Sequence, residues 1–197
     1  MANILVYIGL DDGCASSASL SALNLGRGVA SDLGAALCAL LPCKAPPTYD
    51  EDDIITVLSR HGADKVVLVT NPGLNLPPSA DVLEPVLATV CKRFPPRLFL
   101  LPKEEGLEDL GQNLANALNG DLAHFTGDDG PEADELLPRQ MLLDTADPLV
   151  VLVDDGPEPR VMGEDDTEVV VFQAPLEAAA GEAATGDAGD EDTGADG

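Results

Sequence analysis

The feature that most constrains this chain is a regular alternation of apolar runs with stretches of helical apolar spacing. Five apolar runs are typical of strands buried on both faces; they are Ile4–Gly9, Ala36–Leu41, Val66–Thr70, Arg97–Leu101 and Leu122–Thr126. In the stretches between them, apolar residues recur every three or four positions, as from Leu107 to Leu118. Strand and helix joined repeatedly by short links predict an α/β fold, with a mainly parallel sheet and helices on both faces.

The net charge of −26 is distributed unevenly along the 197 residues. Residues 128–197 contain 21 acidic and two basic side chains, and beyond Leu176 no apolar residue is larger than alanine. We therefore predict an ordered domain over residues 1–177 and a disordered acidic tail over residues 178–197. A surface this acidic repels nucleic acids and anionic membranes, so a basic protein is the better partner. The tail is either an arm that binds such a protein or a solvated segment with no specific partner.

The cysteines and the N-terminal residues indicate where the protein resides. Cys14, Cys38, Cys43 and Cys91 show neither CxxC nor zinc spacing, which favours reduced thiols. No basic leader precedes the first apolar run, and no apolar run approaches the roughly 18 residues of a membrane span. We therefore expect a cytoplasmic protein that does not bind membranes.

Several segments carry a family resemblance in their shared order. The stretch HGADKVVLV at residues 61–69 resembles the "GADKV" turn of electron transfer flavoprotein subunits. Residues 98–122, LFLLPKEEGLEDLGQNLANALNGDL, are similar without a gap to the strand-loop-helix pattern of that family, roughly "LVLFGATTLGRDLAPRLAARLGAGL". Together with the first strand, Leu25-Gly26-Arg27 and the run PLVVLV, these segments resemble the N-terminal domain of the alpha subunit, without its C-terminal FAD domain.

The resemblance implies both a fold and a role. It implies a Rossmann-like, adenine-nucleotide-binding type of sheet with strand order 3-2-1-4-5, to which we expect antiparallel strands from residues 149 to 172 to be added. It also implies a domain that packs on another subunit. Two arginines of the family pattern are Glu108 and Asn113 here, and its "GAT" loop is Pro102-Lys103-Glu104. These changes disfavour an inherited anionic ligand.

Candidate nucleotide contacts lie where the strands of such a sheet end, because ligands bind beyond the carboxyl ends at the topological switch point. The candidates are Gly9, Leu10, Asp11, Pro102, Lys103 and Thr126. The alternative interpretation of Gly9–Gly13 is a solvated turn. No spacing supports a catalytic triad or a metal site, so we predict neither catalytic nor metal-binding residues.

Three functions are compatible with these features of the chain. The first is a non-catalytic electron-transfer accessory that docks on a beta-like subunit or a flavoenzyme. It would hold no cofactor alone and would meet FAD or AMP only in the complex. The second is an AMP-type nucleotide-binding module. The third is a non-redox adaptor that uses its acidic surface as a scaffold for a basic partner.

Overall fold

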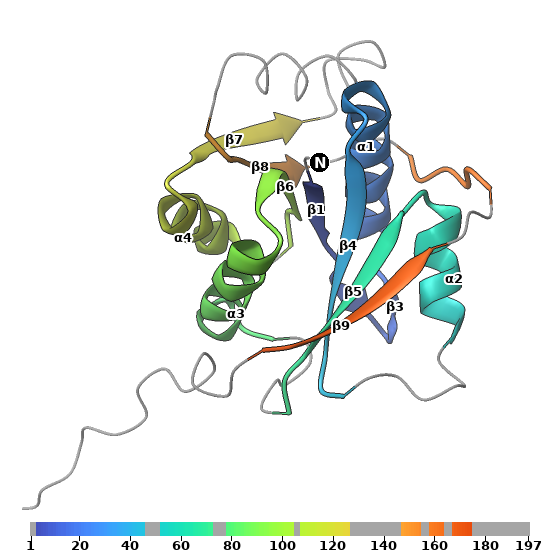
Figure 1. Cartoon of the computed structure of the whole chain (residues 1–197), viewed down its shortest axis with the longest axis horizontal. Coiled ribbons are helices and arrows are strands. Elements are labelled where there is room, and N and C mark those ends of the chain that lie inside the picture. The colour runs from blue at the N-terminus through green and yellow to red at the C-terminus, as the bar shows by residue number, and fades with distance from the viewer. Residues whose placement is uncertain are drawn as a thin grey trace, which may run out of the picture.

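The structure, a computed structural model, describes residues 3–45, 52–72, 78–104, 107–126, 147–154, 158–163 and 167–174. Its centre is a sheet of seven strands, all parallel, in the order β7-β8-β6-β1-β4-β5-β9 (Figure 1). The strands are β1 (Asn3–Tyr7), β4 (Ala36–Cys43), β5 (Lys65–Thr70), β6 (Pro96–Pro102), β7 (Asp121–Thr126), β8 (Leu149–Asp154) and β9 (Glu168–Gln173). The five strands expected from the apolar runs are therefore confirmed, as is the α/β Rossmann-like class.

Two details of the expected topology are wrong. The strands at residues 149–172 are parallel to their neighbours, not antiparallel, and β8 lies between β6 and β7. The fifth expected strand is thus separated from the fourth, and the order 3-2-1-4-5 holds only over its first four members. The length of the connections explains the parallel direction. A crossover between parallel strands needs a dozen or more residues, and the segments before β8 and before β9 are both long enough to form one.

Within the described ranges, four helices cover the two faces of this sheet. One core cluster joins the sheet to α1 (Ser17–Leu33) and α2 (Asp52–Arg60), and a second joins it to α3 (Ala80–Arg93) and α4 (Glu108–Leu118). Among the described helices, none combines the length and apolarity that crossing a membrane requires.

Helix α1 begins and ends at residues with the appropriate capping chemistry. Ser16 is extended and its hydroxyl accepts a hydrogen bond from the Ser19 amide, which satisfies one of the free donors of the first turn. The helix ends at Gly34, whose left-handed conformation suits a residue without a Cβ. Between the caps, a Cβ added to Gly26 would lie 2.8 Å from Leu37 and 3.2 Å from Leu100. Glycine therefore lets α1 approach the sheet closely.

The GAD turn at residues 62–64 is a structural motif. Gly62 has a φ of 93°, and a Cβ there would lie 2.7 Å from the Arg27 side chain. One carboxylate oxygen of Asp64 accepts a hydrogen bond from Arg27 Nη1 at 2.8 Å, and the other accepts from the Leu37 amide at 2.8 Å. Asp64 thus joins α1 to the beginning of β4, which explains this residue type after the glycine.

Candidate functional site

The topological switch point lies between β1 and β6. From β1 the chain builds outward through β4 and β5, then crosses back to place β6 on the other side of β1. Ligand crevices of doubly wound sheets open at such a point, beyond the carboxyl ends of the two strands. Here those ends are Ile8 and Gly9 after β1, and Pro102, Lys103 and Glu104 at the end of β6.

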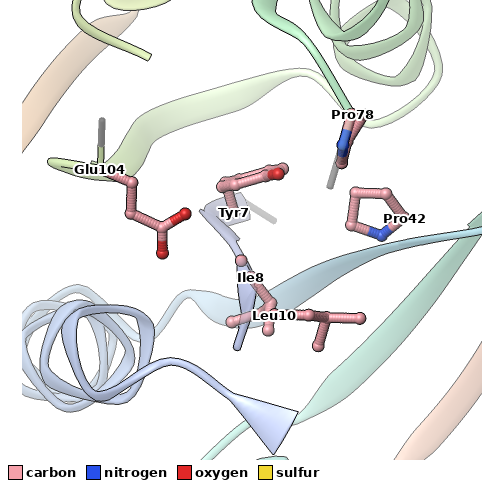
Figure 2. A pocket seen from close by; sticks show the side chains of 7 residues that line it. Tyr7, Ile8, Leu10, Pro42, Pro78 and Glu104 are labelled. Carbon is pink, nitrogen blue, oxygen red and sulfur yellow. The ribbon is translucent and has the colours of Figure 1, made fainter. Parts of the chain in front are cut away.

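The carboxylate of Glu104 fills the space above Gly9. Both of its oxygens would lie 2.3 Å from a Cβ added at Gly9, so only glycine is compatible with this contact. Figure 2 shows the Glu104 side chain reaching from the end of β6 toward the residues that end β1. Ser16 fixes the carboxylate, because its hydroxyl donates a hydrogen bond of 2.6 Å to Glu104 Oε1. The backbone amide of Gly9 is also engaged, and donates to Ser19 Oγ at 2.9 Å.

Little room remains beside this carboxylate. The hollow lined by Tyr7, Gly9, Leu10, Pro42 and Glu104, with Ile8 and Pro78, measures about 20 Å³ (Figure 2). A cavity of this size holds about one water molecule. The hollow between the described residues is therefore much smaller than a nucleotide.

The electrostatics of the crevice also oppose an anion. Burial raises the pKa of the Tyr7 hydroxyl above its ordinary value, and the negative charge of Glu104 raises it further. A phosphate bound here would meet the same negative charge at short range. The start of α1, where the helix dipole favours an anion, already has the Glu104 carboxylate hydrogen-bonded to its N-cap serine. These residues do not fit the phosphate group of a nucleotide.

A second and larger hollow lies next to the first turns of α1. It measures about 510 Å³ and is lined by Ser17, Ala18, Ser21, Lys103, Val153, Asp154, Glu158 and Pro159. Its volume is that of a small-molecule site. The ammonium of Lys103 forms a 2.5 Å ion pair with Asp154, and Glu158 adds a second carboxylate to the lining. The lining is therefore net negative, and it too disfavours phosphate.

The predicted site residues are not brought together in one place. Gly9 and Leu10 line the small hollow, whereas Lys103 lines the larger one. Pro102 is buried as the last residue of β6, and Thr126 is exposed at the end of β7, in register with Asp154. Whether any of the six contacts a nucleotide stays a prediction.

Asp11 belongs to a small hairpin that follows β1. The strands β2 (Leu10–Asp11) and β3 (Cys14–Ala15) are antiparallel, and Asp12 and Gly13 between them both have positive φ. This is the Asp-Gly turn that two-residue hairpins prefer. Asp11, Asp12 and Gly13 are exposed, as a solvated turn requires, whereas Gly9 is buried and Leu10 is half-buried.

The residues that sequence reasoning missed are Glu104, Ser16 and Ser19. Ser16 and Glu104 are 88 positions apart and meet only because β1 and β6 are neighbours. One signal was available, since a serine directly before an apolar helical stripe is the usual N-cap. An acidic residue in place of the family's "GAT" loop was the second signal.

A buried polar cluster holds the segment 158–163 against α1 and α2. Asn24 on α1 donates to the carbonyl of His61 at 3.1 Å and accepts from the amide of Arg160. The amide of Met162 donates to the Arg60 carbonyl at 2.7 Å. The His61 side chain is buried here, and within the described ranges its Nδ1 contacts no hydrogen-bond partner.

This burial predicts a loss of stability in acid that depends on His61. Burial lowers the pKa of His61 below 6.5, although a hydrogen bond with the Arg160 backbone acts in the opposite direction. The unfolded chain therefore binds the proton more readily, and stability falls as the pH drops below the unfolded-state pKa. We expect His61→Gln to reduce the stability lost between about pH 7.5 and about pH 5.5, as measured by urea unfolding.

The matched control for this prediction is the other histidine. His124 is exposed on β7, so His124→Gln should keep the wild-type loss of stability in acid. An equal loss in wild type and His61→Gln would contradict the assignment.

The parallel seven-stranded sheet, with helices on both faces and a switch point between β1 and β6, defines a class, the Rossmann-like α/β domains. Within that class, residues 4–125 match the family model described as electron transfer flavoprotein domain. The match spans more than half of the chain, so the chain belongs to the electron transfer flavoprotein domain family, as the sequence motifs predicted. A search of curated proteins finds none with significant similarity to this chain.

Proposed function

We infer that this chain is a non-catalytic, electron-transfer-flavoprotein-like docking domain of the alpha-subunit N-terminal type. It binds a beta-like subunit or a flavoenzyme in the cytoplasm and contributes structure to an electron-transfer complex. The family membership supports the electron-transfer setting. The observation that supports a role without a bound nucleotide is the Glu104 carboxylate, which lies against Gly9 at the switch point where sheets of this kind bind ligands.

The charges around the crevice support the same conclusion. Glu104 borders the small hollow, Asp154 and Glu158 border the larger one, and Asp154 pairs with Lys103, a cation beside the crevice. Serine hydroxyls and a helix N-terminus would favour an anion, but the chain satisfies them with its own carboxylate. The flavin or AMP of the complex is therefore held by the partner.

The test is purification of the tagged chain from its own cells, followed by size exclusion with flavin absorbance recorded alongside protein. We expect the chain to elute with a second, flavin-carrying protein, and the flavin to follow that protein when the two are separated in denaturant-free high salt. Flavin that stays with the isolated chain would contradict the proposal. So would elution with a partner that carries no flavin, which would favour the adaptor function.

A further inference from the structure

The strand β9 ends the sheet, and in the described part of the chain its only strand neighbour is β5. The amides of Glu168 and Ala174 donate toward β5, to the carbonyls of Asp64 and Thr70. Backbone groups alternate in direction along a strand. The amides and carbonyls of Val169, Val171 and Gln173 therefore point away from β5, toward the outer edge.

The two faces of β9 differ in how they are covered. Val170 and Phe172 pack against the α3 side of the sheet, where the ring of Phe172 meets Phe94 edge-to-face at 6.2 Å. On the other face, Val169 is 45% exposed and Val171 is 53% exposed. In Figure 1, β9 crosses in front of β5 at the side of the molecule next to α2. The strand thus presents two exposed valines beside a row of open backbone groups.

This edge lacks the features that usually prevent strand pairing. Natural edge strands carry lysines, prolines, bulges or inward-pointing charges. The strand EVVVFQ contains neither lysine nor proline, and its pairing with β5 is regular over all six residues, without a bulge. Its only charged side chain is at its first residue. That residue, Glu168, forms a 2.5 Å ion pair with Lys65 of β5.

We propose that β9 is a homodimerisation edge, at which two copies of this chain pair antiparallel about a twofold axis. Antiparallel pairing requires outward-pointing residues to face one another. The symmetric register that centres on Val171 places it opposite its own copy, and places Val169 opposite Gln173. Glu168 then faces Ala174 of the second copy, so within Glu168–Ala174 no like charges oppose one another. The two exposed valines of each copy line one continuous face across the axis.

A second copy fits this edge better than the other occupants. The chain's own tail is a poor apolar partner for the valines, because beyond Leu176 its sequence has no apolar residue larger than alanine. A basic partner is not complementary in charge to this strand, because its only acidic residue is Glu168 and its other five residues are neutral. A neutral, apolar strand is complementary to itself, and an isologous contact uses the same patch on both subunits.

The charge of the whole chain determines how this dimer responds to salt. Two copies of net charge −26 repel each other, although the pairing edge is neutral. Salt screens that repulsion, with a Debye length near 10 Å at 0.1 M and near 3 Å at 1 M. We expect the dimer dissociation constant to fall by about tenfold or more from about 0.1 M to about 1 M NaCl. Association with a basic partner would weaken over the same range.

The test is sedimentation velocity of the full chain at both salt concentrations. Val171→Lys places two ammonium groups directly across the axis and should raise the dissociation constant about tenfold or more. Val161→Lys is the matched control, because Val161 is 69% exposed and lies outside the strand. Circular dichroism and thermal melts check that both variants fold as the wild type does.

A cysteine variant tests the register. In a Cys14→Ser background, Val171→Cys should form a disulfide-linked dimer on mild oxidation, because hydrogen-bonded antiparallel partners are about 5.5 Å apart at Cα. Val161→Cys should not. A chain that is monomeric at both salt concentrations would overturn the proposal. So would a dimer that Val171→Lys and Val161→Lys affect equally, or equal cross-linking of the two cysteine variants.

Discussion

Glu104→Ala should strengthen the binding of AMP at the crevice between β1 and β6 by about tenfold or more. The wild-type carboxylate lies against Gly9 and leaves a hollow of about 20 Å³. Two like charges about 4 Å apart repel by about 4 kcal/mol at an effective dielectric constant near 20, so removing one has a large effect on phosphate binding. The substitution also removes the carboxylate to which the Ser16 hydroxyl donates at the start of α1. Isothermal titration with AMP measures the gain.

Two variants separate charge from space in this experiment. Glu104→Gln removes the charge but keeps the volume, so it should gain less than Glu104→Ala. Glu158→Ala removes a carboxylate from the larger hollow alone and should leave AMP binding at the Gly9 crevice unchanged. Wild-type protein that binds AMP as tightly as Glu104→Ala would show that the carboxylate does not close this crevice.

The same substitution at two glycines of α1 should change stability in opposite directions. A Cβ at Gly26 would lie 2.8 Å from Leu37, 3.2 Å from Leu100 and 3.3 Å from Val6, all fully buried. Gly26→Ala should therefore destabilise the protein by about 1–3 kcal/mol through overpacking. Gly28 has nothing within 4 Å of its Cβ position, so Gly28→Ala should stabilise the helix by about 0.5–1 kcal/mol.

Urea unfolding of the two variants measures this difference, with each variant as the other's control for helix propensity. If both substitutions stabilised the protein, the close packing of α1 on the sheet would be incorrect. The outcome also concerns the site, because α1 contains Ser19 and its N-cap is Ser16, whose hydroxyl donates a hydrogen bond to Glu104.

Most of the fold could be predicted because burial leaves a strong pattern in the sequence. A run such as PLVVLV shows that a strand is buried on both faces, and all of Leu149–Val153 is buried in β8. The run says nothing of strand direction or of which neighbours it takes. The sequence could therefore identify β8 and β9 as strands, but their parallel direction and the place of β8 between β6 and β7 depended on long connections.

Less of the site could be predicted, for a related reason. The topology placed candidates correctly at the ends of β1 and β6, since that follows from strand order. Which side chain fills the crevice depends on the conformation of the loop after Pro102, which directs Glu104 toward Gly9 and Lys103 toward Asp154. The family motifs Leu25-Gly26-Arg27 and Gly62-Ala63-Asp64 are packing and hydrogen-bonding features of the fold.

Native mass spectrometry of the chain, purified gently from its own cells, tests most directly the claim that it is a docking domain without its own nucleotide. It reports partner subunits and bound small molecules in one spectrum. We predict a complex of this chain with a second, flavin-carrying protein, from which the chain is released with no added mass. A free chain that retains AMP or a flavin would contradict the claim and would identify it as a nucleotide-binding module.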